Sequence, residues 1–175
     1  AESNRLKQAK AKVVIASIRA VLQTLDKQIQ DIDQQLDDHI KQSPVWRKKQ
    51  DLLKSMPGVG KQTARMLLAC LPELGMISRQ AIAALTGLAP MNRDSGGMKG
   101  KRVISGGRSN VRTALYMATL TAIRRNPIIK GYYDKLLQAG KAKKLSLLAC
   151  ARKLLVTLNA MIRTQTPWRN TLEAA

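Results

Sequence analysis

The sequence has few of the residues that enzymes use for acid–base or metal chemistry. It contains a single histidine, His39, and residues 52–172 contain only three acids, Glu73, Asp94 and Asp134. A Ser-His-Asp triad is excluded because His39 lies far along the chain from the serines discussed below. Three scattered carboxylates are also too few for the metal site of a nuclease. The common hydrolase chemistries are therefore excluded.

Disulfides and membrane spans are missing as well. Two cysteines, Cys70 and Cys150, are too few for a disulfide framework and are typical of a reducing cytosol. No run of about 18 apolar residues occurs, which argues against a transmembrane helix. With 175 residues and 45% apolar content, the chain is large enough for a folded core. We therefore expect a cytoplasmic protein.

Basic residues dominate the C-terminal two thirds of the sequence. Residues 52–172 contain 21 lysines and arginines against three acids, whereas the two signs nearly balance in residues 1–51. A surface of one sign repels itself unless a polyanion screens it, which points to nucleic acid. An anionic membrane is the main rival, but the basic residues do not follow a single amphipathic helix.

The N-terminal segment has a heptad pattern. Residues 4–41 contain no glycine or proline, which predicts one long helix that ends at Ser43-Pro44. Its apolar residues are spaced alternately three and four apart, and His39 keeps the register. We call the following residues the apolar seam: Ile15, Ile18, Leu22, Leu25, Ile29, Ile32 and Leu36. The seam predicts a coiled coil with another copy of the chain. The alternative is a long amphipathic helix packed on its own domain.

The rest of the sequence predicts short helices and no strands. Apolar residues keep a helical period, and glycine or proline marks each break. We expect helices at residues 46–55, 61–71, 79–86, 110–125, 128–138 and 145–163. The predicted fold class is therefore all-α, with a coiled-coil domain over residues 1–43 and a compact helical domain over residues 44–175.

A glycine-flanked turn separates the first two of these short helices. Gly58 and Gly60 flank Val59, and Lys61 opens the second helix. We expect the glycines to adopt angles that other residues resist, Val59 to be buried, and the helix N-terminus to attract a phosphate. The arrangement resembles the helix-hairpin-helix motif of DNA repair proteins. The alternative is a turn required only for packing.

A long glycine-rich connection over residues 87–108 carries the second candidate site. It holds six of the 11 glycines, and connections of this length are usually functional or disordered. Six basic residues lie in it or just after it, and the following helix directs its positive end towards it. The basic residues expected to bind nucleic acid here are Arg93, Lys99, Lys101, Arg102, Arg108 and Arg112.

A serine hydroxyl attacking a phosphate is the chemistry that the remaining residues allow. Ser95 is the candidate nucleophile because it precedes two glycines and has basic neighbours. Ser105 and Ser109 are rivals, although Ser109 is expected to cap the following helix. The other interpretation is that Ser95 only fills a glycine-rich loop.

Several motifs, taken in order, resemble the C-terminal transposase domain of insertion-sequence transposases of the IS-one-ten type, a family of RNA-guided serine recombinases. The matching segments are residues 56–60, 84–90, 94–97, 102–108, 111–112, 115–118, 125–128, 140–141, 152–155 and 158–161. The run Gly106-Gly107-Arg108 is typical of the IS-eleven-eleven branch. The resemblance covers about two thirds of the chain, and the coiled coil lies in its family position.

The resemblance implies a role for Ser95 and several partners. Ser95 matches the serine that forms a covalent phosphoserine link to DNA. The family also has a RuvC-like domain whose four acidic residues bind metal, and an RNA encoded by the element guides target choice. We therefore expect Mg²⁺ at a RuvC-like domain outside this sequence and no cofactor within it. The expected partners are double-stranded DNA, a guide RNA and a second copy of the chain, with no membrane.

The sequence is thus interpreted as the C-terminal part of a longer, nucleoid-associated prokaryotic recombinase. Alone, it is expected to bind nucleic acid without turnover. One alternative is a non-catalytic helix-hairpin-helix module with a dimerising helix. A further alternative is an assembly protein whose function is the coiled coil.

Overall fold

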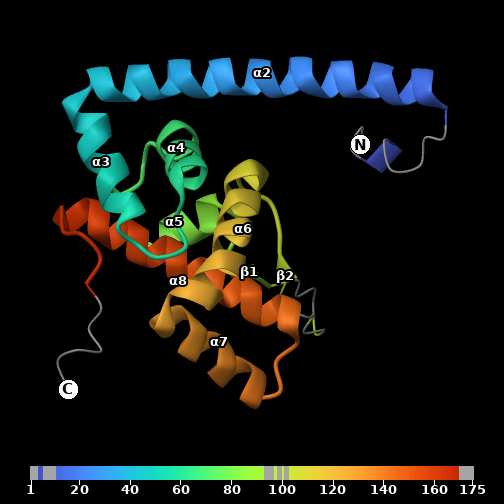
Figure 1. Ribbon diagram of the computed structural model, residues 1–175. Helices are drawn as coiled ribbons and strands as arrows, with labels where there is room; N and C mark the ends of the chain where they lie inside the picture. Colours follow the sequence, from blue (N-terminus) through green and yellow to red (C-terminus); the bar gives the residue numbers. More distant parts are fainter. Residues whose placement is uncertain (1–3, 6–10, 93–96, 98–99, 101–102, 170–175) are drawn as a thin grey trace. The chain divides into compact units, whose positions relative to one another are not determined.

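The computed structural model describes residues 4–5, 11–92, 97, 100 and 103–169, and it confirms the all-α fold class with a long N-terminal helix (Figure 1). The chain divides into two units, Ala1–Arg47 and Lys48–Ala175, and the division falls within a helix. We call the second of these the compact unit. The helices of the described part are α2 (Lys12–Gln42), α3 (Pro44–Lys54), α4 (Lys61–Cys70), α5 (Arg79–Leu85), α6 (Ser109–Arg125), α7 (Pro127–Gln138) and α8 (Lys143–Thr164).

The long helix α2 ends where the sequence predicts. Its last residue is Gln42, and α3 begins at once with Pro44, which fixes its own φ angle at a value that suits a first helical position. Ser43 lies between them in an extended conformation, and its Oγ accepts a hydrogen bond from the Trp46 backbone N–H at 3.5 Å. The proline therefore separates two helices without a loop between them.

Short polar side chains begin two helices of the compact unit. Ser78 accepts a hydrogen bond from the Ala81 N–H at 3.2 Å at the start of α5. Asn126 ends α6 and begins α7, and its Oδ1 accepts from the backbone N–H groups of Ile128 and Ile129 at 3.1 and 3.2 Å. These caps satisfy N–H groups that have no carbonyl partner within the helix.

The core of the compact unit forms around α8. This helix packs against α5, α6 and α7, and α4 packs against α6 (Figure 1). Asn159 on α8 is 2% exposed and holds the turn before α5: its Oδ1 accepts from the Gly75 N–H at 2.7 Å, and its Nδ2 donates to the Ile77 carbonyl at 3.0 Å. The fully buried aliphatic side chains include Leu53, Leu67, Ile82, Leu115, Leu154, Leu155 and Leu158.

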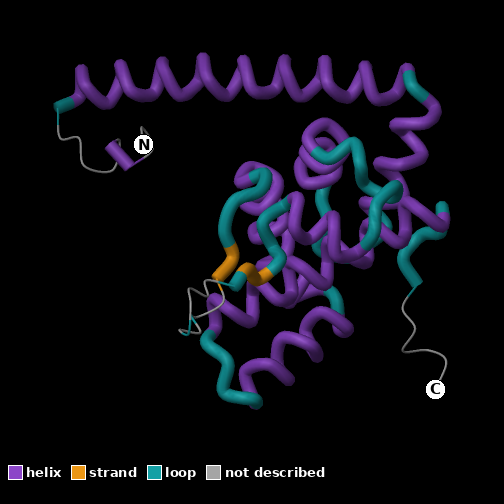
Figure 2. Tube along the Cα trace, turned by 180° about the vertical axis from the view of Figure 1, so that it is seen from behind, coloured by secondary structure: helices purple, strands orange, loops and turns teal. Residues whose placement is uncertain are grey.

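One feature of the connection between α5 and α6 differs from the predicted absence of strands. Two-residue strands β1 (Pro90–Met91) and β2 (Val103–Ile104) pair antiparallel, with Met91 opposite Val103 (Figure 2). A ladder this short shows no alternating pattern in sequence, so periodicity could not reveal it. The pair brings together the two ends of residues 92–102.

Helix α8 is the only helix of the described residues with the length and composition of a membrane span, with a mean hydropathy of 1.5. More than half of that stretch is buried inside the compact unit. A core helix passes the same test of length and composition, so this feature is explained by packing.

Candidate nucleic-acid interface

The turn between α3 and α4 is tightly packed at its first glycine. Gly58 has a φ of +102°, and a Cβ atom there would lie 2.5 Å from Cα and Cβ of Ala122 on α6. Val59 is 5% exposed and belongs to the core. The expected positive φ and the expected burial of Val59 are both confirmed here.

The second glycine of the turn is different. Gly60 has an ordinary extended conformation, with φ −87° and ψ 176°, and a Cβ atom there would meet nothing within 4 Å. The expectation that both glycines need unusual backbone angles is therefore wrong for Gly60. Gly60 is the N-cap of α4 without a side-chain cap, and the following residue, Lys61, is exposed. Neither packing nor backbone strain accounts for a glycine at this position.

A pocket of about 370 Å³ opens beside this turn. Its first wall is the turn itself, from Gly58 to Gly60, with Thr63 of α4. Its second wall comes from α6 and includes Thr121 and Arg125. Thr63, Thr121 and Arg125 are not among the site residues predicted from the sequence. The spacing of four between Thr121 and Arg125 places them on one face of α6, but which face meets the turn depends on tertiary packing.

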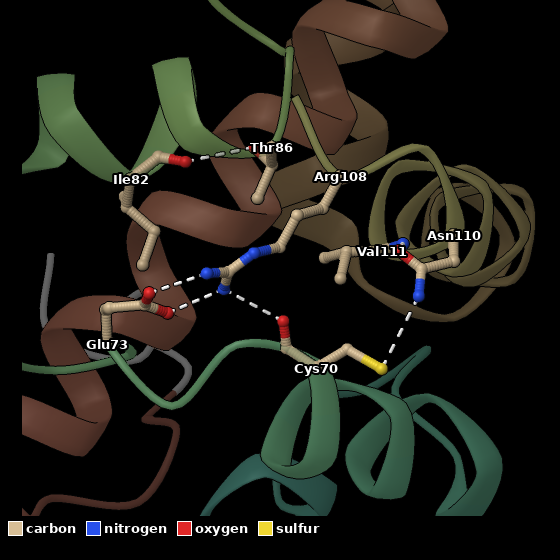
Figure 3. Close-up of polar contacts among 7 residues, drawn as sticks. All are labelled: Cys70, Glu73, Ile82, Thr86, Arg108, Asn110 and Val111. Atoms are coloured by element: carbon tan, nitrogen blue, oxygen red, sulfur yellow. Dashed lines mark hydrogen bonds and ion pairs between the residues drawn. The ribbon is translucent and has the colours of Figure 1, made fainter. Parts of the chain in front are cut away.

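Arg108 forms the main ion pair at the other end of α6. Its Nη1 and Nη2 donate to the two carboxylate oxygens of Glu73, each at 2.6 Å, and Nη1 also donates to the Cys70 carbonyl at 2.9 Å (Figure 3). The hydrogen bonds from Arg108 are the main cause that lowers the pKa of Glu73 to about 2. Both side chains are about one third exposed. Arg108 therefore connects the start of α6 to the end of α4 in a bidentate geometry.

Arg112 holds the last part of the connection against α5. Its Nη1 donates to the Gly106 carbonyl at 2.6 Å and to the Thr86 carbonyl at 3.3 Å. Gly107 has a φ of +66°, and a Cβ atom there would collide with the backbone at Gly87 and Leu85. Arg108 and Arg112, which are two of the residues predicted to bind nucleic acid, therefore stabilise the loop from which α6 starts.

Of the serines singled out in the sequence, Ser109 does not lie as expected. Ser109 is the first residue of α6 instead of its cap, and the N-cap is Arg108, which makes no side-chain cap bond. The Ser105 hydroxyl lies 3.7 Å from the Met91 sulfur, across the short strand pair. Ser95, Arg93, Lys99, Lys101 and Arg102 lie outside the described residues.

The two candidate phosphate-binding regions lie at opposite ends of α6. Gly58 packs at Ala122 near the C-terminal end, whereas Arg108 and Arg112 lie at the N-terminal end. At 1.5 Å per residue, the helix separates them by roughly 20 Å. Within the described residues, no group of three or more histidine, cysteine or acidic side chains could hold a metal ion.

The apolar seam of α2 is largely uncovered in its C-terminal half. Ile29 and Ile32 are each 57% exposed, and Leu25 and Leu36 are each 44% exposed. Ile15 and Leu22 are half-buried, and Ile18 is buried. His39, at the next seam position, is exposed.

The chain is similar to several known proteins. Residues 50–134 match the family model described as Transposase IS116/IS110/IS902 family. A protein of insertion element IS110 from Streptomyces coelicolor is 27% identical over 164 residues, which cover 93% of this chain and 40% of that protein. The pilin gene-inverting protein of Moraxella bovis is 32% identical over 130 residues, which cover 72% of this chain and 40% of that protein.

A protein of insertion element IS900 from Mycobacterium paratuberculosis is 32% identical over 157 residues, which cover 87% of this chain and 38% of that protein. The chain therefore spans about 40% of the length of the curated relatives that it matches. The segment matched by the family model includes both the turn between α3 and α4 and position 95.

Proposed function

Because residues 50–134 are a transposase domain of the IS116/IS110/IS902 family, we propose that this chain is the C-terminal part of a transposase that cuts and rejoins DNA through Ser95. The observation that carries the proposal is the family match across residues 50–134, which includes position 95 and the turn at Gly58 to Gly60. The inverting activity in the name of the Moraxella bovis protein supports strand exchange as the outcome.

The proposed chemistry is a phosphoryl transfer to serine. The Ser95 oxygen attacks a scissile DNA phosphorus, so that a phosphoserine ester bond forms and the bond from phosphorus to one deoxyribose oxygen breaks. The serine loses its proton, and the released sugar oxygen gains one. Rejoining is the reverse transfer to the deoxyribose oxygen of another strand. Neighbouring arginines and lysines stabilise the negative charge that develops on the phosphate.

The described residues of this chain contain no cluster of ligands that could hold Mg²⁺. Mg²⁺ at a RuvC-like domain outside this sequence remains part of the proposal, and no step is assigned to it here. The chain alone is proposed to bind DNA and a guide RNA without cleaving either.

The pocket beside the turn is the proposed DNA backbone contact. Gly60 leaves its face open, so a phosphate can approach the backbone closely, and Arg125 brings positive charge to the opposite wall. The positive end of the α4 dipole adds to this attraction. Contacts of this kind position a duplex without reading its sequence. With the basic connection at the far end of α6, a duplex is held at two places.

The test of the nucleophile is Ser95→Ala in the full-length recombinase. We expect recombination to be lost and the covalent protein–DNA adduct to disappear, while salt-sensitive DNA binding remains. Ser105→Ala is the matched control and is expected to keep the adduct. If Ser95→Ala retains the adduct, the nucleophile is wrong. If the unsubstituted full-length protein forms no adduct with its DNA, the alternative of a non-catalytic binding module replaces the proposal.

The test of the backbone contact is Gly60→Ala in the 175-residue chain. Because the new methyl group meets nothing in the fold, the free energy of unfolding should fall by no more than about 1 kcal/mol, the cost of alanine at an N-cap, while DNA affinity falls about tenfold by loss of close approach. Affinity measured by fluorescence anisotropy gives the answer, with circular dichroism as the folding control. Unchanged affinity in a folded Gly60→Ala chain would show that this turn serves packing only.

A further inference from the structure

We propose that α2 pairs with α2 of a second copy in the antiparallel direction. The inference rests on the prediction from the heptad pattern that the apolar seam joins two copies, and it goes further by fixing the direction and register of the pair. Four seam residues, Leu25, Ile29, Ile32 and Leu36, are exposed on the single chain. A second α2 offers a seam of the same length, although its N-terminal half is partly covered on the single chain, with Ile18 buried.

The charges of α2 are divided between its two halves. From Lys12 to Leu25 the helix carries two basic residues, Lys12 and Arg19, and no acid. From Asp26 to Gln42 it carries five aspartates against two lysines. A parallel pair would lie acidic half against acidic half, whereas an antiparallel pair lies basic half against acidic half. Charge complementarity therefore favours the antiparallel direction.

The charged residues that flank the seam also favour the antiparallel direction. The flanking positions on one side recur every seven residues and are occupied by Lys12, Arg19, Asp26 and Asp33, the last three directly after the seam residues Ile18, Leu25 and Ile32. In an antiparallel coiled coil, these positions face the same positions of the partner. Such flanking pairs decide partner choice and orientation.

One register satisfies the seam and the charges together. When Leu22 lies opposite the partner's Leu25, the other layers pair Ile18 with the partner's Ile29 and Ile15 with the partner's Ile32. The same register places Arg19 beside the partner's Asp26, and Lys12 beside the partner's Asp33. The two-fold axis repeats each pair, so four attractive contacts form.

A parallel pair gives none of these contacts. There, each flanking position faces the position on the other side of the partner's seam. Val14 would meet the partner's Arg19, Val21 would meet the partner's Asp26, and Gln28 would meet the partner's Asp33. No pair of opposite charges results.

The direction has a consequence for DNA binding. In this register, the C-terminal ends of the two α2 helices lie about 55 Å apart along the pair, at 1.5 Å per residue. The compact units are thus attached at distant points, and two separate DNA sites are held by one dimer. A parallel pair would attach both compact units at the same end.

The first test exchanges the two central charges. Arg19 and Asp26 are both exposed, so their replacement leaves folding intact. We expect Arg19→Glu and Asp26→Lys, each alone, to raise the dimer dissociation constant of the 175-residue chain roughly tenfold at low salt, measured by sedimentation equilibrium. The double variant should return to within about threefold of the original, because the pairs are restored with signs reversed. Single variants without effect, or a double variant that is weaker than either, would overturn the direction.

The second test separates the direction from the pairing itself. In a Cys70→Ser background, Leu25→Cys lies near the two-fold axis and should cross-link with a short bismaleimide in either direction. Ile32→Cys should not cross-link, since the two copies lie about 25 Å apart in the antiparallel register. Cys150 stays unreactive because it is buried, which raises its pKa to about 11.

Cross-linking at positions 25 and 32 distinguishes the antiparallel pair, the parallel pair and the monomer. Cross-linking at position 25 without cross-linking at position 32 supports the proposal. Strong cross-linking at position 32 shows that the seam pairs in the parallel direction. A chain that stays monomeric and cross-links at neither position shows that the seam does not join two copies, and the proposed oligomerisation then fails without bearing on Ser95.

Discussion

At the scale of single residues, Gly58 and Gly60 lie in different environments although they flank the same valine. Gly58 is held at a positive φ against Ala122, so the fold itself requires it. Gly60 has no such constraint, and its open face is the basis of the proposed phosphate contact. Backbone angles and contacts distinguish Gly58 from Gly60, whereas their positions in the sequence do not.

Gly58→Ala is expected to destabilise the compact unit by about 2–4 kcal/mol, since it combines backbone strain with a collision at Ala122. Gly60→Ala is the matched control and should lower the free energy of unfolding by no more than about 1 kcal/mol, the cost of alanine at an N-cap. Urea denaturation of both variants measures the difference. Equal stability of the two would contradict the packing described at the turn.

The Glu73–Arg108 pair predicts a dependence of stability on pH. The pKa of Glu73 is lowered to about 2 by its hydrogen bonds from Arg108, so the ionised carboxylate stabilises the fold above its ordinary pKa of 4.5. This contribution is lost as the pH falls from 4.5 to about 2. Thermal unfolding of the chain and of Glu73→Gln should therefore differ at pH 7 and converge near pH 2. A difference that does not change with pH would show that the carboxylate charge contributes nothing.

At the scale of elements, most helix boundaries followed from local chemistry. Pro44, the turn at Pro57-Gly58 and the pair Asn126-Pro127 lie where helices begin or end in the structure, and the predicted limits of α3 to α8 differ from it by two residues or fewer. The strand pair, the Glu73–Arg108 contact and the α6 wall of the pocket could not be predicted in this way. Each joins segments that are distant in sequence, and one chain without its fold does not show which faces meet.

Asn126 ends α6 and begins α7, so its replacement should affect both helices. Asn126→Ala removes the acceptor for the Ile128 and Ile129 N–H groups in a site that is 1% exposed, and should cost about 1–2 kcal/mol of unfolding free energy. Asn126→Ser keeps a capping oxygen and should recover part of that loss. The two variants are compared by urea denaturation, and a serine variant no more stable than the alanine variant would argue against capping.

At the scale of the whole molecule, the charge is divided in the way that the two proposed partners require. The α2 segment carries both signs, as suits pairing with another protein chain, while residues 52–172 carry 21 basic residues against three acids, as suits nucleic acid. The compact unit tolerates this excess because its core around α8 is apolar and its charges lie mostly on the surface. Binding should then be governed by release of counterions from DNA.

The chain is expected to bind duplex DNA with a steep dependence on salt, losing about a thousandfold in affinity between 50 and 200 mM salt if six or more phosphates are contacted. Arg125 and Arg124 are neighbours at the end of α6, and only Arg125 lines the pocket beside the turn. Arg125→Ala should therefore weaken binding at low salt and reduce the slope of log affinity against log salt by about one. Arg124→Ala should leave the slope nearly unchanged. Anisotropy titrations at four salt concentrations measure both slopes, and equal slopes for the two variants would place the DNA backbone away from this pocket.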